Sequence, residues 1–463
     1  MKRPIAMVPM NIAAMPVIDC HCSSISSTTL SFSSDTDATN FKDHITLTRS
    51  RTADAAGSGV EMTIREWLED LRFAGMKLGL ERAQALLERL GNPQLEFPSI
   101  HVAGTNGKGS LCAQLSANAT ASGFSVGLFT TPHLVMVEER IRIDGRPISS
   151  ADFDRHVEAV HEAASEGEVL EPTFYEVTFI AAMLHFAEIG IERAIIETGL
   201  GGRGDATRLV DADLCVITTI SKDHAEILGD TLPEIAREKV GIHRPGVPLI
   251  ALESNDGAVT AVFAEVAGDD LYLHEKMPGH SPWEIWAELA GMISLAMGWS
   301  ETNAPCTWPG RSPNWKPSGF ASRVTFSAAH NDEGFQAELD RIQDPCVFVI
   351  GMSAKHDLEQ ATASVTSELW HSNTFRHIVV TQPTSGRLPA VEAEDLARII
   401  CGNRLDPPLI ENDPIRALNL GVTMANQSGI NVVVMGSIYL IGDILSYHAQ
   451  HDELDLWEEL SIH

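Results

Sequence analysis

A short apolar strand that runs into a glycine-rich turn and then a helix most constrains how this chain can fold. Residues 99–103 form the strand, residues 104–110 (GTNGKGS) the turn and residues 111–121 the Ala- and Leu-rich helix. Glycines let backbone N–H groups approach phosphate oxygens, and the helix N-terminus adds positive potential. Lys108 supplies a cation and Ser110 a hydroxyl that reaches Mg²⁺. The sequence therefore predicts a phosphate-binding loop, although an extra glycine separates the lysine from the serine.

Val- and Ile-rich strands alternate with helices along the chain from Met62 onward. Strands are expected at residues 99–103, 125–130, 193–198, 214–220 and 248–252, and helices at residues 151–164, 176–189 and 233–240. This alternation predicts a parallel sheet with helices on both faces. Ligands bind such sheets at the carboxyl ends of the strands, where the predicted phosphate loop lies.

Composition bounds the class of protein. The chain has 463 residues, which is too long for one hydrophobic core. A formal charge of −30 argues against nucleic acid or an anionic membrane surface as a partner, and no apolar run has the length of about eighteen residues that a membrane span needs. Seven scattered cysteines form no disulfide framework, so a reduced, cytoplasmic compartment is expected.

Three segments are expected along the chain. Residues 1–61 are rich in Ser, Thr and Asp without a helical or strand period, and we interpret them as disordered or as a non-native extension. Residues 62–308 contain the predicted P-loop-containing parallel sheet. Residues 309–463 are expected to form a smaller C-terminal α/β (Rossmann-like) domain, with strands at 346–352, 377–381 and 431–435.

Three side chains follow the strand ends of the first predicted domain. Glu197 and His224 follow the strands of two βα units that are consecutive in the chain, and Lys239 lies one helix later. Taken singly, they also fit a surface salt bridge, a capped loop histidine and a solvated helix charge. A carboxylate and an imidazole beside a phosphate loop, together with a hydroxyl and water, would form a site that fits Mg²⁺.

Six segments carry a family resemblance, in order along the chain. They are LGNPQ (90–94), HVAGTNGKGS (101–110), TPHLVMVEERIRIDG (131–145), ETGLGGRGDATRLVDADLCVITTISKDHAEILGDTLPEIAREKVGIHRPG (197–246), WPGR (308–311) and MGSIYLIGDI (435–444). With these segments the chain resembles the folylpolyglutamate synthase/dihydrofolate synthase family, within the Mur ligase superfamily of ATP-dependent amide ligases. The resemblance covers the chain from about Met62 onward, closely in the N-terminal half and in patches in the C-terminal half, and the extra glycine of the phosphate loop is part of the family's sequence pattern.

The resemblance implies a folate-biosynthesis ligase that acts as a monomer. ATP would phosphorylate the carboxylate of a pterin or folate substrate, and the amino group of L-glutamate would attack the acyl phosphate. Catalytic roles are implied for Lys108, Glu197, His224 and Lys239, and ATP contacts for Gly104, Thr105, Asn106, Gly107, Lys108, Gly109, Ser110, Arg311 and His330.

The resemblance also implies metal and substrate contacts. Ser110 and Glu197 would hold one Mg²⁺, and Glu197 with His224 the second, assisted by Lys239 if this lysine is carbamylated. Pterin contacts are implied for Thr173, Tyr175, Asp205 and Ala206, and a contact near the incoming glutamate for Ser437. Tyr175 also fits a core aromatic residue.

The C-terminal half departs from the family pattern at four positions. Ser327 and Lys355 stand where the family has aspartates, and Pro282 and Ile285 where it has a glutamine and an asparagine. Loss of a buried, charged hydrogen-bond partner costs about 1.5–3 kcal/mol. Three interpretations therefore stay open: an active synthase, another Mur-type amino-acid ligase, or a catalytically impaired homologue that binds ATP and folate.

Overall fold

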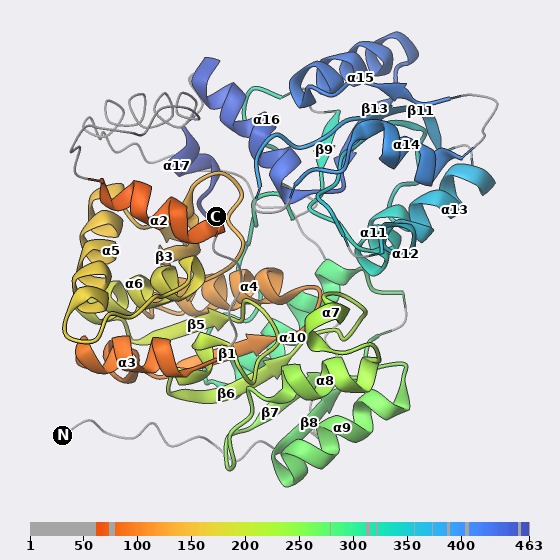
Figure 1. Cartoon of the computed structure of the whole chain (residues 1–463). Coiled ribbons are helices and arrows are strands. Elements are labelled where there is room, and N and C mark those ends of the chain that lie inside the picture. The colour runs from red at the N-terminus through yellow and green to blue at the C-terminus, as the bar shows by residue number, and fades with distance from the viewer. Residues whose placement is uncertain are drawn as a thin grey trace. The chain divides into compact units, whose positions relative to one another are not determined.

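The computed structural model describes residues 62–73, 79–277, 279–311, 315–320, 323–355, 357–372, 374–386, 389–402, 407–451 and 455–462. The extension predicted at residues 1–61 lies outside this set. From residue 63 onward the chain forms one compact unit that contains two β-sheets (Figure 1). None of the helices in the described ranges is both long and apolar enough to cross a membrane.

The first sheet has eight strands in the order β4-β3-β2-β5-β1-β6-β7-β8. Neighbouring strands from β2 to β8 run parallel, whereas β3 pairs antiparallel with both β2 and β4. The strands are β1 (Ser99–Ala103), β2 (Val126–Phe129), β3 (Ile141–Ile143), β4 (Arg146–Pro147), β5 (Arg193–Glu197), β6 (Ala212–Ile217), β7 (Leu249–Leu252) and β8 (Leu271–His274).

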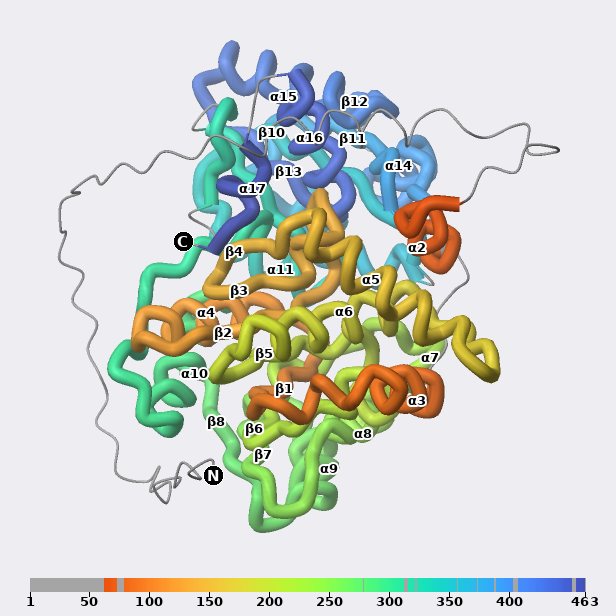
Figure 2. The backbone as a smooth tube through the Cα atoms, turned by 90° about the vertical axis from the view of Figure 1, so that its left-hand side faces the viewer, coloured from red at the N-terminus to blue at the C-terminus, as the bar shows by residue number. Residues whose placement is uncertain are grey.

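Helices cover both faces of the first sheet, because alternate residues of its central strands point to opposite sides. Ala194 and Ile196 of β5 join a core with six helices, whereas Ile195 is fully buried outside that core. Those helices are α2 (Ile64–Phe73), α3 (Glu81–Arg89), α5 (Ser150–Ser165), α6 (Phe174–Ile189), α8 (Leu232–Val240) and α9 (Gly257–Ala267). In Figure 2, α3, α5 and α6 lie along the same side of β1 and β5.

The other face is covered by α4 (Lys108–Ala121), which packs against β1, β2 and β5. No residue of α4 joins the core described above, so the helix lies on the opposite side of the sheet. The helix α10 (Pro282–Ala296) packs on α4, and short helices occur at α7 (Ala225–Leu228), η2 (Pro93–Leu95), η3 (Val137–Arg140), η4 (Ala206–Leu209) and η5 (Gly268–Asp270).

The second sheet has five parallel strands in the order β12-β11-β10-β13-β9. Its elements, cyan to blue in Figure 1, gather around this sheet. The strands are β9 (Val324–Phe326), β10 (Cys346–Ile350), β11 (Phe375–Val380), β12 (Leu409–Ile410) and β13 (Asn431–Met435). The helices are α11 (Asp332–Leu339), α12 (Leu358–Ala361), α13 (Ala363–His371), α14 (Ala393–Cys401), α15 (Pro414–Ser428) and α16 (Ile438–His451). The last helix, α17 (Leu456–Glu459), leads instead to the β3–β4 hairpin, where the N–H of Ile462 donates to the carbonyl of Gly145 (3.0 Å).

The predicted α/β architecture is confirmed, with one departure at the edge of the first sheet. The sequence analysis did not predict the antiparallel strands β3 and β4. Their turn, Asp144-Gly145, has φ of +50° and +84°, the backbone of a tight hairpin for which an Asp-Gly pair is the usual sequence signal. The short strands β8, β9 and β12 were also missed. The predicted domain boundary between residues 308 and 309 stays a prediction.

Candidate active site

The phosphate loop after β1 is tied to the loop after β6. The backbone N–H of Thr105 donates to the carbonyl of Thr219 (2.7 Å), and the N–H of Asn106 donates to Oγ1 of the same threonine (3.2 Å). Gly104 has φ +144°, and a Cβ at this position would overlap Oγ1 of Thr218. The loop therefore needs glycine at its first position, because an L side chain would be both strained and sterically blocked.

The helix α4 begins at Lys108, three residues earlier than predicted, and Gly107 is its N-cap with φ +84°. The positive end of this fourteen-residue helix therefore lies at the loop, where it attracts phosphate. The indole of Trp286, from α10, packs so closely on Gly107 that a Cβ there would overlap the ring. The sequence analysis missed this tryptophan, because no local pattern shows which residue of α10 faces the loop.

Replacing Gly107 with Ala is expected to weaken ADP binding and lower the melting temperature. The new Cβ meets the indole of Trp286, and the residue must keep a positive φ, a combination that costs about 1–3 kcal/mol. The steric overlap and the backbone strain can be separated by thermal unfolding and ADP titration of three proteins: Gly107→Ala, Trp286→Ala and the double variant. The double variant should recover part of the loss, and strictly additive effects of the two substitutions would contradict the steric contact.

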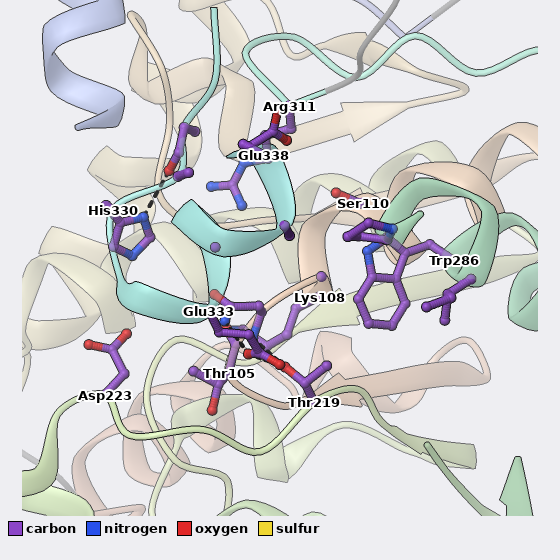
Figure 3. Close-up of a pocket in the computed structure, with 18 of the residues that line it drawn as sticks. Thr105, Lys108, Ser110, Thr219, Asp223, Trp286, Arg311, His330, Glu333 and Glu338 are labelled. Atoms are coloured by element: carbon purple, nitrogen blue, oxygen red, sulfur yellow. Dashed lines mark hydrogen bonds between the residues drawn. The ribbon is translucent and has the colours of Figure 1, made fainter. Parts of the chain in front are cut away.

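A cavity of about 350 Å³ opens at the phosphate loop, and residues of the second sheet's elements line its far side (Figure 3). The predicted site residues that line it are Thr105, Asn106, Gly107, Lys108, Ser110, Glu197, His224, Lys239, Arg311 and His330. The predicted residues that do not line it are Gly104, Gly109, Thr173, Tyr175, Asp205, Ala206 and Ser437. The structure thus brings most of the predicted ATP and metal groups together at one cavity, whereas the predicted pterin and glutamate contacts lie outside its lining.

Glu197 ends β5 at this cavity and is only 2% exposed. Its Oε2 accepts a hydrogen bond from the backbone N–H of Thr131 (3.0 Å). Burial raises the pKa of the Glu197 carboxyl, and the positive charges of Lys108 and Arg311 oppose this rise. Ser110, Glu197 and His224 together present a hydroxyl, a carboxylate and an imidazole to one cavity, a donor set that suits a divalent cation.

Two lysines share one carbonyl oxygen at the phosphate loop. Nζ of Lys108 and Nζ of Lys239 donate to the carbonyl of Gly104, at 3.2 Å and 2.8 Å. Lys239 is 5% exposed, and burial together with the charge of Lys108 lowers the pKa of Lys239 to about 7. A large share of this amine is therefore uncharged near neutral pH, which is the form that reacts with CO₂.

His224 follows β6 in a left-handed conformation, with φ +54°, and its side chain is 41% exposed. The preceding carboxylate, Asp223, pairs with Nζ of Lys355 (3.1 Å), so an ion pair joins the loop after β6 to the second sheet. Lys355, which stands where the family has an aspartate, therefore has Asp223 as a specific ion-pair partner. Burial opposes the shift, but Lys355, His224 and His330 lower the pKa of Asp223 below its usual range.

The helix α11 of the second sheet contacts the phosphate loop directly. Asn331, its N-cap, accepts from the N–H of Gly334 (2.9 Å) and donates from Nδ2 to Oδ1 of Asn106 (3.0 Å). Oε2 of Glu333 accepts from Nδ2 of Asn106 (2.5 Å) and from Oγ1 of Thr219 (3.1 Å). The sequence analysis did not predict Glu333, because its partners lie more than a hundred residues away in the chain.

Replacing Glu333 with Gln is expected to strengthen ADP binding about 5–30-fold. The Glu333 carboxylate lies on the phosphate loop, so it repels the negatively charged phosphates of bound ADP. Repulsion between two unit charges about 8–15 Å apart in a partly buried site amounts to about 1–2 kcal/mol. Glutamine keeps the acceptor for Asn106 but removes the charge. Asp340→Asn, at the far end of α11, is the matched control for ADP titration, and a Glu333→Gln variant with unchanged or weaker affinity would contradict this repulsion.

Two further residues of this side are Ser327, which is buried, and His330, which is half-buried. Ser327, which replaces the family's aspartate, is 5% exposed, and its Oγ accepts from the N–H of Ala329 (3.2 Å). Nδ1 of His330 lies 2.9 Å from the carbonyl of Ala328. Burial, with a contribution from Lys355, lowers the pKa of His330 to about 4, so this imidazole is neutral at pH 7.

Two of the predicted pterin residues, Tyr175 and Asp205, belong to one hydrogen-bonded network at the edge of the cavity. The hydroxyl of Tyr175 donates to Oδ1 of Asp205 (3.0 Å), and Oδ2 of the same carboxylate accepts from the N–H groups of Gly199 and Leu200 (both 2.9 Å). Gly199 and Leu200 line the cavity, so this carboxylate sets the shape of its edge. Thr173 serves as the N-cap of α6.

The other two predicted substrate residues are also buried. Ala206 begins η4 and is 4% exposed. Ser437 follows β13, is 3% exposed, and its Oγ lies 3.3 Å from Oγ of Ser353. The roles predicted for Thr173, Tyr175, Asp205, Ala206 and Ser437 stay predictions.

Comparisons with known proteins agree with the chemistry of this cavity. No protein-family model matches the sequence. The chain is 37% identical to the probable dihydrofolate synthetase of Schizosaccharomyces pombe, over 80% of this chain and 98% of that protein. It is 40% identical to the dihydrofolate synthase/folylpolyglutamate synthase of Bacillus subtilis over 202 residues, 43% of this chain and 47% of that protein, so this match spans about half of the bacterial relative.

A solved structure has the same fold. The folylpolyglutamate synthase of Mycobacterium tuberculosis, complexed with ADP and AMPPCP, superimposes with a TM-score of 0.70 and 25% identity. The match covers 83% of this chain and 97% of that one, and therefore includes both sheets.

Proposed function

The chain belongs to the dihydrofolate synthase/folylpolyglutamate synthase family of ATP-dependent ligases, and from this premise we propose that it joins L-glutamate to dihydropteroate. This acceptor is favoured by the share of each relative's sequence that aligns with this chain, which differs between relatives. The sequence alignment with a probable dihydrofolate synthetase runs along nearly the whole of that protein, whereas the sequence alignment with the Bacillus subtilis dihydrofolate synthase/folylpolyglutamate synthase covers about half of that protein. The full-length match also favours a folate substrate over the substrates of other Mur-type ligases.

The reaction brings ATP and a carboxylate substrate together, and both are anions, in a protein whose own formal charge is −30. The γ-phosphoryl group of ATP passes to a carboxylate oxygen and ADP leaves; glutamate nitrogen then attacks the acyl carbon, phosphate leaves and the nitrogen loses a proton. Lys108 and Arg311 line the cavity and are placed to offset phosphate charge. We assign Lys108, at the start of α4, to the transferring phosphoryl group.

The ligase uses ATP with a divalent metal ion. Ser110, Glu197 and His224 would hold that ion, which when bound neutralises phosphate charge. Lys239 fits this set as a carbamate, because its amine is buried at the same loop and a carbamate would turn a cation into a carboxylate-like ligand. Uncarbamylated Lys239 would instead repel the ion.

We place the pterin ring beside Tyr175 and Asp205, with Thr173 and Ala206 around it, and the incoming glutamate near Ser437. The support for the pterin position is the hydrogen-bonded link from Asp205 to two residues of the cavity edge.

An ADP-release assay tests the acceptor. With ATP, Mg²⁺ and L-glutamate, dihydropteroate should support ADP release and a tetrahydrofolate monoglutamate should not, and Lys108→Ala provides the background. Release with tetrahydrofolate alone would show the acceptor to be wrong. Release no higher than the background with either acceptor would instead favour the catalytically impaired homologue.

We also propose that the enzyme acts in the cytoplasm as a monomer. Cys112, Cys215, Cys306, Cys346 and Cys401 are free thiols in the described part of the chain, which suits a reducing compartment. Size-exclusion chromatography with light scattering measures the oligomeric state, and a stable dimer at micromolar concentration would contradict the second part of this proposal.

A further inference from the structure

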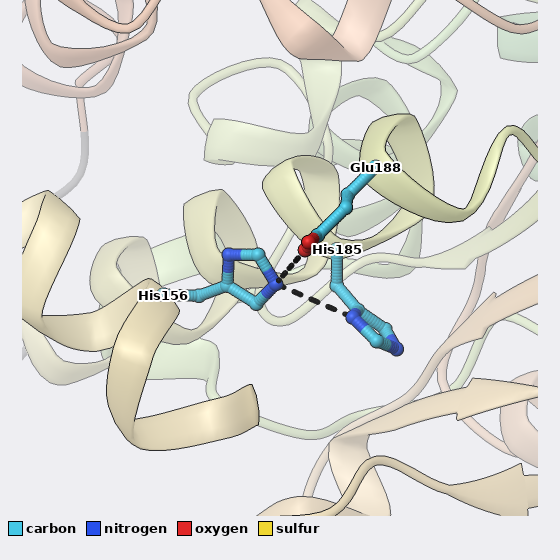
Figure 4. Close-up of side chains that lie close together, drawn as sticks. All are labelled: His156, His185 and Glu188. Carbon is cyan, nitrogen blue, oxygen red and sulfur yellow. Dashed lines mark hydrogen bonds and ion pairs between the residues drawn. The ribbon is translucent and has the colours of Figure 1, made fainter. Parts of the chain in front are cut away.

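Two histidines and a glutamate converge between α5 and α6, away from the ligase cavity (Figure 4). His156 projects from α5, whereas His185 and Glu188 are three residues apart on α6 and share one face of that helix. Nε2 of His156 lies 3.3 Å from Nδ1 of His185 and 3.1 Å from Oε2 of Glu188. The three atoms all lie within 4.8 Å of one another.

Hydrogen bonds within the cluster leave at least one of these three atoms without a good partner. If Nε2 of His156 carries the hydrogen, a single N–H faces two acceptors, the second ring and the carboxylate of Glu188. If Nδ1 of His185 carries it instead, the lone pair of Nε2 faces the carboxylate. Both rings are buried, at 4% and 5% exposed, where polar atoms without good partners cost stability. A cation placed between the three atoms would accept one lone pair from each of them.

The spacing matches that of metal ligands. Two donors at about 2.0–2.1 Å from a zinc ion in tetrahedral geometry lie about 3.3–3.4 Å apart. The observed separations of 3.3 Å and 3.1 Å need little movement to reach this value. Two imidazoles and a carboxylate are also ligands that zinc prefers. Burial lowers the pKa of His156 to about 4 and lowers that of His185, so both rings have lone pairs available at neutral pH.

We propose that His156, His185 and Glu188 form a zinc-class divalent metal site that joins α5 to α6. The side chain of Glu188 is 48% exposed, so the fourth position faces the solvent side and takes water. Nη2 of Arg155 lies 2.8 Å from the same glutamate oxygen and 2.8 Å from Asp152. The arginine is half exposed and can withdraw, and until it does so it competes with the metal for Glu188.

Cobalt titration tests the site in full-length, tag-free, EDTA-treated protein. Co²⁺ in a low-coordinate site gives visible absorption bands, and Zn²⁺ should abolish them. All proteins carry Cys20→Ser and Cys22→Ser, which remove the two thiols of the sequence Cys20-His21-Cys22 outside the described residues, because closely spaced thiols also bind Co²⁺ and Zn²⁺. They also carry His224→Ala, which removes one of the ligands proposed at the ligase cavity. In this background Glu188→Gln deletes a ligand, whereas Arg155→Gln deletes the competing cation and is the matched substitution at the same exposed edge.

The background protein is expected to bind one equivalent of Co²⁺ with bands that Zn²⁺ displaces, and Zn²⁺ should raise its melting temperature by at least about 2 °C. Glu188→Gln should weaken cobalt binding by at least about tenfold. Arg155→Gln should leave binding equal or tighter. The proposal is overturned if the background protein shows no zinc-displaceable bands, or if Glu188→Gln binds Co²⁺ as tightly as the background. It is also overturned if Arg155→Gln weakens cobalt binding as much as Glu188→Gln, because both losses would then follow from disturbing this exposed edge and not from removing a metal ligand.

Discussion

Glu197→Gln is expected to lower the ligation rate by at least about 10²–10³-fold while the protein keeps its fold. Glutamine has the same size and still accepts from the backbone N–H of Thr131, so the local geometry survives. The negative charge is lost, and with it a group proposed to hold the metal ion. Because burial already raises the pKa of this carboxyl, the neutral side chain should not destabilise the folded state strongly.

The matched control for this variant is Glu338→Gln. Glu338 also lines the cavity, and burial raises its pKa as well, but no role in metal binding is proposed for it. The measurements are ADP release at saturating substrates and thermal unfolding. A Glu197→Gln protein with full activity would refute the metal role, and an equal loss in the two variants would show that any buried charge in the cavity matters, not Glu197 in particular.

The phosphate loop and the groups around it were predictable because their signals are local. A strand, a glycine turn and a helix follow one another within about twenty residues, and the carboxyl ends of neighbouring parallel strands meet at one edge of a sheet. Glu197 and His224 end β5 and the β6 loop, on either side of β1, so their convergence on Lys108 follows from topology.

The far side of the cavity could not be predicted in the same way. Trp286 reaches Gly107 from α10, and Glu333 reaches Asn106 from α11, so both contacts depend on how separate parts of the chain pack. No periodicity or motif encodes such long-range packing. The edge strands β3 and β4 are a different case, because their Asp144-Gly145 turn carried a local signal that was not used.

Matching a family motif also does not show how its side chains are used. Asp205 was predicted as a pterin partner, yet in this structure its carboxylate accepts from Tyr175, Gly199, Leu200 and Thr207. A pterin N–H must therefore share these oxygens or displace one of the protein donors. The resemblance could predict that Asp205 belongs to the site. It could not predict that protein groups already donate hydrogen bonds to both carboxylate oxygens, because this depends on the folded conformation of the loop.

Lys239→Ala is expected to lower the ligation rate by about 10²-fold or more, and short carboxylates are expected to restore part of it. Native Lys239 is buried beside Lys108, with a pKa of about 7, so its uncharged amine can add CO₂ and become a carbamate. The alanine variant cannot form that anion and leaves a cavity at the phosphate loop. Acetate or formate can enter the cavity and replace the missing carboxylate, so the rate should rise with the concentration of either salt.

Lys239→Met separates this mechanism from a purely structural role. Methionine also lacks the charge and the hydrogen bond to Gly104, but it fills the space, so added carboxylate should not restore its activity. Intact mass under native conditions with bicarbonate should show one CO₂ adduct on the wild-type protein and none on either variant. Equal rescue of the alanine and methionine variants, or a fully active wild-type protein without the adduct, would rule out the carbamate and leave Lys239 as a buried cation that holds the phosphate loop in place.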